Sequence, residues 1–135
     1  MWEIIIFGSS MAPIEFSHTI VELRNGIVWL LFRENAELDV KEISELIKAC
    51  ERIAGHKPYL LMSDVRVHLA ITSEGRKAAA DKKEAPLLIA NAAIVNNLAV
   101  RVTANFFSNF NKPHFKFRVF SDAKKAEKWL LRCKD

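Results

Sequence analysis

The stretch that most constrains the fold is residues 60–75, which read LLMSDVRVHLAITSEG. It begins inside an apolar run, residues 59–62, of the kind that forms a strand buried on both faces of a sheet. Larger apolar side chains then recur at every second residue as far as Ile71. Thr72 or Ser73 follows as a candidate helix N-cap, because a hydroxyl oxygen can accept a hydrogen bond from a backbone N–H group of the first turn. The stretch therefore predicts a strand that leads into a helix and displays hydroxyl groups where the two meet.

Two strands joined by a tight turn are predicted nearer the N-terminus. Residues 14–24 alternate between apolar and polar side chains, with a change of phase near Ile20 that indicates a β-bulge. Residues 27–32 are continuously apolar. Asn25 and Gly26 lie between these runs, and both tolerate the positive φ angles that a two-residue hairpin turn requires. We therefore expect an antiparallel hairpin here.

The clearest helix is predicted over residues 39–54. Its apolar side chains recur at three- and four-residue steps and form one face, made of Val40, Ile43, Leu46, Ile47, Cys50 and Ile53. Asp39 is the expected N-cap, and Glu42 has the position of the second carboxylate in a capping box. Gly55 fits the left-handed conformation that ends many helices.

The remaining elements follow from the same kinds of pattern. A polar, alanine-rich helix is expected from Ser73 to about Ala85, because Pro86 disfavours helical backbone in the residue before it. The later elements are a buried strand over residues 87–95, a helix over 98–110, a strand over 115–120, and a helix over 122–132 with Ser121 as its cap.

The predicted order is strand, strand, helix, strand, helix, strand, helix, strand, helix. Strands that alternate with helices after one hairpin favour an α/β fold, with a mixed, mostly parallel sheet of about five strands, four helices and an antiparallel edge. A chain of 135 residues suits one domain. We place this domain at residues 14–135, with residues 1–13 as an N-terminal extension or an extra edge strand.

Residues 60–75 resemble the signature of the STAS domain, the module shared by sulfate transporters and anti-sigma-factor antagonists. In that family a buried strand ends in Asp-Leu-Ser, and Asp-Ser-Ser-Gly opens a helix after a short apolar run. Asp64-Val65-Arg66 has the first position here, and Thr72-Ser73-Glu74-Gly75 has the second at the same spacing. A resemblance to uncharacterised bacterial STAS-like proteins extends over about residues 16–131, and it implies the STAS fold.

The resemblance implies a regulatory protein-interaction site at Asp64, Thr72, Ser73, Glu74 and Gly75. In anti-sigma-factor antagonists, a serine of Asp-Ser-Ser-Gly is phosphorylated by a partner kinase, and the added charge breaks the complex. Ser73 matches the first serine, and Glu74 matches the second, which is the one normally modified. Either the switch is lost, or Ser73 or Thr72 substitutes, or Glu74 imitates the phosphorylated state. The alternative is purely structural, with a hydroxyl as cap and Glu74 favouring the helix dipole.

A second candidate site is a ligand or dimer surface around Phe106, Phe107 and Phe110. A helix with phenylalanines on more than one face has more apolar surface than one sheet covers. Further phenylalanines follow at 115, 117 and 120, and aromatic residues at such spacing usually belong to the core. The STAS fold is similar to that of lipid-exchange proteins of the CRAL-TRIO class, which implies a lipid or another small apolar ligand.

Signals for catalysis and for bound metals or cofactors are mostly missing. The four histidines, His18, His56, His68 and His114, have no close metal-binding spacing. The four glycines form neither a GxGxxG motif nor a P-loop, and the sequence has no GxSxG elbow. We therefore expect no enzyme activity, no metal and no cofactor.

Charge is unevenly distributed along the chain. Residues 1–75 hold 7 basic and 11 acidic groups, whereas residues 76–135 hold 13 basic and 5 acidic groups. An anionic partner such as nucleic acid is one explanation of this bias. A solvated set of lysines on two helices is the simpler one, because no nucleic-acid-binding motif accompanies the charge. Nucleic-acid binding is therefore the weakest functional hypothesis.

The two cysteines, Cys50 and Cys133, form no CxxC pair, and no stretch reads as a secretory signal or a membrane span. These features predict a cytoplasmic protein. The leading hypothesis is a STAS-like interaction module that forms a homodimer, binds an unknown protein partner and is not an enzyme. A carrier of a lipid or small apolar ligand is the alternative.

Overall fold

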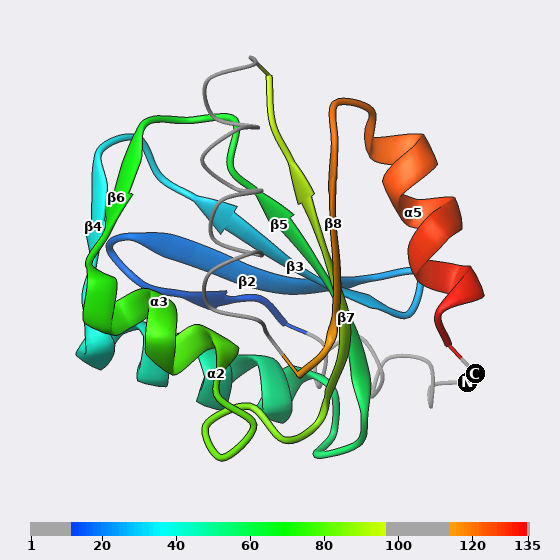
Figure 1. The fold of residues 1–135 in the computed structure, drawn as a ribbon, viewed down its shortest axis with the longest axis horizontal. Coiled ribbons are helices and arrows are strands. Elements are labelled where there is room, and N and C mark those ends of the chain that lie inside the picture. Colours follow the sequence, from blue (N-terminus) through cyan, green and yellow to red (C-terminus); the bar gives the residue numbers. More distant parts are fainter. Residues whose placement is uncertain (1–11, 97–113, 135) are drawn as a thin grey trace.

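A six-stranded sheet forms the centre of the computed structural model, which describes residues 12–96 and 114–134 (Figure 1). The strands in chain order are β1 (Ile14–Glu15), β2 (Thr19–Arg24), β3 (Ile27–Phe32), β4 (Ala36–Leu38), β5 (Tyr59–Asp64), β6 (Leu69–Ile71), β7 (Leu88–Ile94) and β8 (Lys116–Phe120). The described helices are α2 (Val40–Ile53), α3 (Ser73–Ala80) and α5 (Ala123–Arg132). The helix predicted over residues 98–110 lies outside the described residues.

The main sheet is mixed and mostly parallel, as predicted. Its strand order is β1-β2-β3-β5-β7-β8; the β1–β2 and β2–β3 pairs are antiparallel, and the other three pairs are parallel. Strands β4 and β6 pair in parallel as a separate small sheet. The prediction of about five strands was therefore wrong. Each strand of the small sheet has three residues. Strand β4 is too short for a side-chain alternation to be recognised, and the alternation that runs into β6 does not show that β6 is a separate strand.

The predicted hairpin is confirmed by its turn. Asn25 and Gly26 have φ angles of 50° and 78°, and Arg24 pairs with Ile27 across the turn. The predicted β-bulge near Ile20 was wrong, because the chain turns earlier. The Phe16 N–H group donates to the Thr19 carbonyl oxygen at 2.8 Å, and β1 folds back antiparallel onto β2. The change of phase along residues 14–24 marks a turn between two strands.

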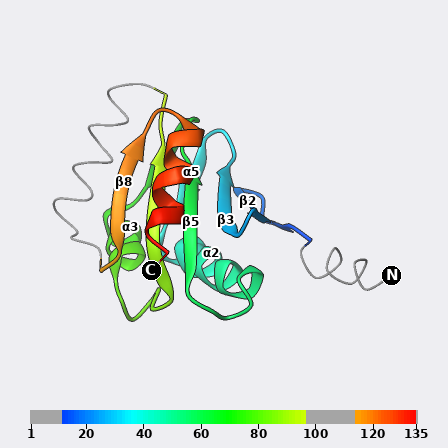
Figure 2. The same cartoon turned by 90° about the vertical axis from the view of Figure 1, so that its right-hand side faces the viewer.

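Alternate side chains of the sheet supply two apolar layers. On one face, Leu30 and Leu61 pack with the buried side of α2, which includes Leu46. On the other face, Met62 and Trp29 belong to a second cluster with α5. Figure 2 shows α2 and α5 on opposite sides of the sheet. Strand β5 is therefore covered on both faces, which explains its unbroken apolar run.

The boundaries of α2 and α5 agree with the prediction to within one residue, whereas α3 ends earlier than predicted and α5 has a different cap. Asp39 caps α2 in a complete capping box with Glu42, and Gly55 has a φ angle of 71°. Helix α3 ends at Ala80 and not at Ala85, since the N–H groups of residues 84 and 85 both donate to the Asp81 carbonyl oxygen in a separate turn. Asp122, not Ser121, caps α5 by accepting from the Lys124 N–H group.

The packing of α5 predicts a sharp contrast between two adjacent leucines. Leu130 is fully buried, whereas Leu131 is 45% exposed. Leu130→Ala should lower the free energy of unfolding by about 2–5 kcal/mol, because it leaves a cavity beneath the helix. Leu131→Ala should change it by less than about 0.5 kcal/mol. Urea unfolding followed by circular dichroism measures both, and equal losses would contradict the assignment of α5 to the second core layer.

Candidate functional site

The N-termini of α2 and α3 lie side by side because the short strands before them are paired. Strand β4 leads through Asp39 into α2, and β6 leads through Thr72 into α3. In the parallel β4–β6 pair, Leu38 is opposite Ile71, so the next residues along each strand are also neighbours. The Thr72 N–H group donates to the Leu38 carbonyl oxygen at 3.0 Å. This pairing brings together two helix caps from distant parts of the chain.

The Thr72 hydroxyl connects the two caps. It accepts a hydrogen bond from the Gly75 N–H group at 3.0 Å and donates to Asp39 Oδ1 at 2.7 Å. The same Asp39 oxygen accepts from the Val40 N–H group at 2.8 Å. The hydrogen bond from Thr72, and then that from Val40, hold the pKa of the Asp39 carboxyl below its usual value. Of the two predicted cap candidates, Thr72 is the one that caps α3.

Ser73 and Glu74 are the exposed members of the predicted site. Both lie in the first turn of α3, and the Ser73 hydroxyl has no hydrogen-bond partner within the described residues. The Glu74 carboxylate lies 3.8 Å from the Lys77 ammonium, and both side chains are about two-thirds exposed. An exposed ion pair of this kind contributes little to stability. Both side chains are therefore free to meet another molecule.

Gly75 allows α3 to start close to the small sheet. A Cβ atom there would lie 3.1 Å from Thr72 Oγ1, 3.2 Å from Ile71 Cγ2 and 3.2 Å from the Leu38 carbonyl oxygen. Each distance is shorter than an ordinary van der Waals contact, so a side chain at this position would require its neighbours to shift by a few tenths of an ångström. Gly75 is buried for this reason, and its part in the site is to permit the close approach.

Asp64 lies at the end of β5 and forms an ion pair of its own. Arg66 Nε donates to Asp64 Oδ1 at 2.9 Å, and a second guanidinium nitrogen donates to Oδ2 at 2.7 Å. Burial alone would raise the pKa of the Asp64 carboxyl, but the Arg66 hydrogen bonds outweigh it and the pKa is lowered. No hydrogen bond within the described residues joins Asp64 to residues 72–75. The ion pair with Arg66 orders the exit of the strand, and a part for Asp64 in the predicted site stays a prediction.

Asp39 belongs to the site, although the sequence predicted it only as a helix cap. It contacts Thr72 across a separation of 33 residues. The contact depends on the β4–β6 pairing. The sequence shows the alternation that runs into β6, but β4 has three residues and gives no recognisable pattern. The one signal in the sequence was that each cap candidate directly follows a large apolar residue.

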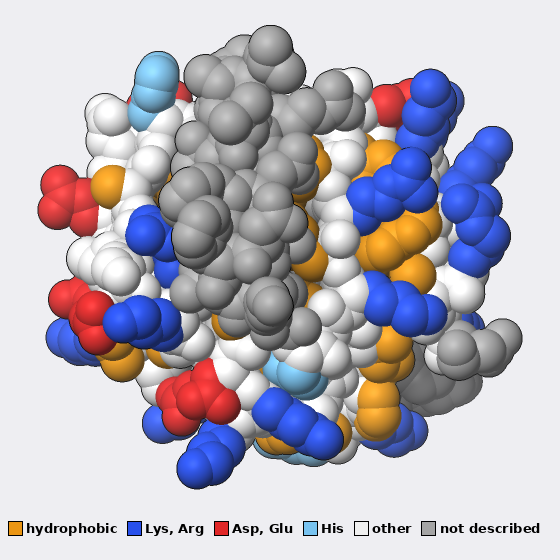
Figure 3. Space-filling view, viewed as in Figure 1, with side chains coloured by type: hydrophobic (Ala, Val, Ile, Leu, Met, Phe, Trp, Pro, Cys, Tyr) orange, Lys and Arg blue, Asp and Glu red, His pale blue; other side chains and the backbone are white. Residues whose placement is uncertain are grey.

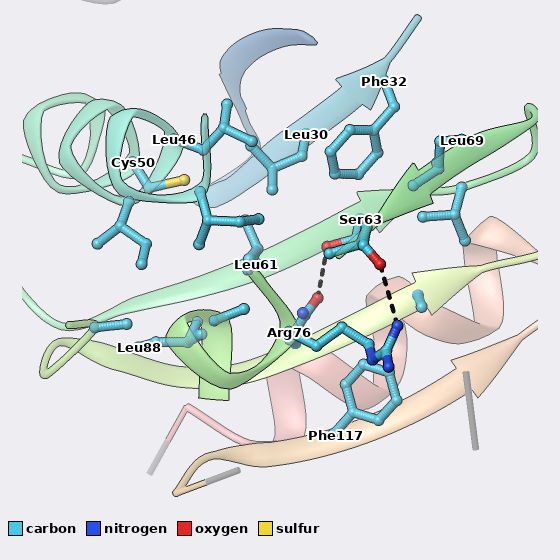
Figure 4. A pocket seen from close by; sticks show the side chains of 18 of the residues that line it. Leu30, Phe32, Leu46, Cys50, Leu61, Ser63, Leu69, Arg76, Leu88 and Phe117 are labelled. Carbon is cyan, nitrogen blue, oxygen red and sulfur yellow. Dashed lines mark hydrogen bonds between the residues drawn. The ribbon is translucent and has the colours of Figure 1, made fainter. Parts of the chain in front are cut away.

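A cavity of about 410 Å³ lies between the main sheet, α2 and α3 (Figure 4). Phe115 and Phe117 line it, whereas Phe120 packs on the opposite face of the sheet, 5.7 Å from the Trp129 ring. The predicted surface of Phe106, Phe107 and Phe110 lies outside the described residues. The apolar recess therefore lies beside the start of α3, and the phenylalanines after residue 114 are divided between two layers.

The basic half of the chain contributes an exposed cationic surface. Figure 3 shows Lys and Arg side chains gathered over α5, where Lys124, Lys125, Lys128 and Arg132 are exposed. A solvated helix face stays the simpler explanation of these charges. Among the described residues, no group of three or more His, Cys, Asp or Glu side chains could hold a metal ion. In the same part of the chain, no helix is both long and apolar enough to cross a membrane.

Comparison with solved structures confirms the predicted STAS-like fold. The chain is similar to an uncharacterised protein of the DUF3478 family with a SpoIIAA-like fold, from Shewanella loihica PV-4, with a TM-score of 0.58. The match has 15% sequence identity and covers 87% of this chain and 98% of the other, so the likeness concerns the fold alone. More specifically, residues 21–134 match the family described as Domain of unknown function (DUF7793), and the chain belongs to that family. None of the curated proteins matches it.

The link between the caps predicts a difference between two neighbouring hydroxyl residues. Thr72→Val removes both hydrogen bonds with little change of volume and should lower the free energy of unfolding by about 1 kcal/mol. Ser73→Ala is the matched control and should change it by less than about 0.5 kcal/mol, because its hydroxyl makes no hydrogen bond within the described residues. Urea unfolding measures both, and a larger loss for Ser73→Ala would show that the cap is misassigned.

The lowered pKa of Asp39 predicts how this difference depends on pH. A carboxyl whose pKa is lower in the folded chain stabilises the fold above its ordinary pKa, about 3.9, and loses that effect as pH falls through the folded pKa. Thr72→Val removes the largest cause of the shift. The stability gap between wild type and Thr72→Val should therefore be widest near neutral pH and narrow in acid. Carboxyl NMR titration of Asp39 should show its pKa rising in the variant, and an unchanged value would refute the link.

Proposed function

We propose that this protein is a non-catalytic regulatory module that binds a protein partner through the start of α3. The observation that supports the proposal is that Ser73 and Glu74 are exposed on a turn whose cap is fixed to a second helix. The SpoIIAA-like fold adds support, and so does the resemblance of residues 60–75 to the STAS signature of anti-sigma-factor antagonists. We name residues 72–75 the presenting turn.

The presenting turn is ordered before any partner arrives. Thr72 bonds to Gly75 within the turn and to Asp39 on α2, and Thr72 also pairs through its backbone with Leu38. A surface that is already ordered loses less conformational entropy on binding, so more of the contact energy contributes to affinity. The hydrogen bonds of the turn therefore favour recognition as well as stability.

Glu74 and Ser73 have different parts in the proposal. Glu74 places a fixed negative charge in the first turn of α3, where the helix dipole favours it, and an opposing basic group on the partner would recognise it. Ser73 is the hydroxyl suited to phosphorylation, because modification of Thr72 would break both of its hydrogen bonds. A phosphate on Ser73 would add roughly −1.5 to −2 charges beside Glu74 and change the surface that the partner meets.

The expectations of a homodimer and of a cytoplasmic location stay predictions from the sequence. The hydrogen bonds of the Thr72 hydroxyl in the presenting turn are made to residues of the same chain. The partner is a protein of unknown identity.

Charge reversal at Glu74 tests the proposal. Glu74→Lys should weaken capture of the partner at least about tenfold, because it places like charges opposite each other. Thermal stability should hardly change, since Glu74 is exposed. The matched control is Glu84→Lys, which reverses an exposed charge beyond the other end of α3.

The measurement is quantitative mass spectrometry of proteins that the immobilised chain captures from a lysate of its own host, followed by affinity measurement with the purified partner. A protein retained by wild type and Glu84→Lys but lost with Glu74→Lys supports the proposal. Equal retention by all three chains would exclude the presenting turn as the interface.

A further inference from the structure

The cavity beside α3 has the size of a ligand site. Its volume of about 410 Å³ lies within the range of roughly 300–1,000 Å³ that small-molecule sites occupy. The cavity is therefore large enough for a small ligand, and the side chains of its walls indicate what would fit it.

Most of the wall that the described residues form is apolar, and two segments supply it beside the main sheet. Helix α2 contributes Leu46, Ile47 and Cys50, and burial raises the pKa of the Cys50 thiol to about 12, so this wall carries no thiolate at neutral pH. The other source is the stretch after β5, where every second residue from Val65 to Ile71 lines the cavity. This is the same alternation that the sequence shows between the apolar run and the helix cap. It gives the cavity a hydrocarbon surface suited to an aliphatic chain.

Arg76 is the one side chain of fixed charge among the described residues that line the cavity. It projects from α3, and its guanidinium makes one hydrogen bond, to the Ile71 carbonyl oxygen at 3.1 Å (Figure 4). A guanidinium has five N–H donors. No carboxylate within the described residues pairs with Arg76, and Asp64 is already held by Arg66. Most of the donors of Arg76 are therefore available to an anion.

A second polar position lies in the wall formed by the main sheet. Ser63 on β5 donates its hydroxyl proton to Asn91 Oδ1 on β7 at 2.9 Å, and both residues line the cavity. The hydrogen bond fixes the Asn91 amide, and its NH2 group has no acceptor within the described residues. The cavity thus combines a long apolar wall with a few fixed donors, a combination typical of sites that orient an amphiphilic ligand.

We propose that this cavity binds a small amphiphile with an unbranched hydrocarbon chain and one carboxylate. The hydrocarbon chain of the ligand lies against α2 and the alternating residues after β5. The ligand's carboxylate lies at the Arg76 guanidinium, whose planar fork matches the two carboxylate oxygens. A single arginine balances one negative charge, which favours a carboxylate over a more highly charged phosphate ester. This site goes beyond the proposed partner interface and does not depend on it, because Glu74 and Ser73 lie on the exposed side of α3.

Decanoate tests the ligand class on the purified full chain. Isothermal titration calorimetry should show saturable binding with one site per chain. Arg76→Gln should weaken decanoate binding at least about tenfold, because it removes the charge and the fork. Lys77→Gln is the matched control, since it removes a positive charge from the next residue of α3, an exposed one that does not line the cavity, and should leave the affinity unchanged.

Acetate and 1-decanol separate the contribution of the ligand's carboxylate from that of its hydrocarbon chain. Acetate has the carboxylate without the chain and should not bind measurably, and 1-decanol should bind with the same affinity to wild type and Arg76→Gln. Ala79→Phe fills the cavity from α3 and should abolish decanoate binding while circular dichroism shows the chain still folded.

Absence of saturable decanoate binding to the wild-type chain would overturn the proposal, as would equal decanoate affinity in wild type and Arg76→Gln. Neither result bears on partner capture by Glu74→Lys, so the two proposals fail separately.

Discussion

Strand β5 pairs in parallel with β3 on one side and β7 on the other, and each of its faces is covered by an apolar layer. Parallel strands require crossover connections, so after each strand the chain must leave the sheet and cross back to the end at which that strand began. The exit from β5 occurs at Asp64, whose ion pair with Arg66 ends the strand. The loop after this exit, β6 and the start of α3 together form the part of the molecule with functional features.

The small β4–β6 sheet fixes the position of the segment that follows β5. Six residues in two strands bury little area, yet their parallel pairing fixes where two helices begin. Asp39 and Thr72 follow the paired strands and bond to each other, so each helix cap is oriented by the other. Gly75 then allows α3 to start closer to β4 and β6 than a Cβ atom would fit without a small shift of its neighbours. The positions of Ser73 and Glu74 result from these contacts, because a cap that holds the first turn also fixes the directions of its side chains.

Local signals predicted local structure well, and long-range contacts account for what was missed. The capping box of α2 and the turn at Asn25 depend on residues within four positions of each other, so the sequence showed them directly. The Asp39–Thr72 hydrogen bond joins residues 33 positions apart through strands of three residues, and no periodicity signals it. The alternation after Asp64 was visible, but alternation shows only that one side is apolar. It does not show whether this apolar side lines a cavity or packs against another sheet.

Helix α3 connects the two proposed sites. It has eight residues, of which Gly75 and Ala80 are buried, so its position depends on its cap and on the contacts at its start more than on a large apolar face. An element with so few buried side chains is near the low end of local stability, where binding energies are large enough to shift its position. Ser73 and Glu74 face outward from α3 while Arg76 faces the cavity, so an anion bound at Arg76 and a partner bound at Glu74 contact the same short helix. Thermodynamic linkage then requires any effect to be mutual: if an anion at Arg76 changes the affinity for a partner by some factor, the partner changes the affinity for the anion by the same factor.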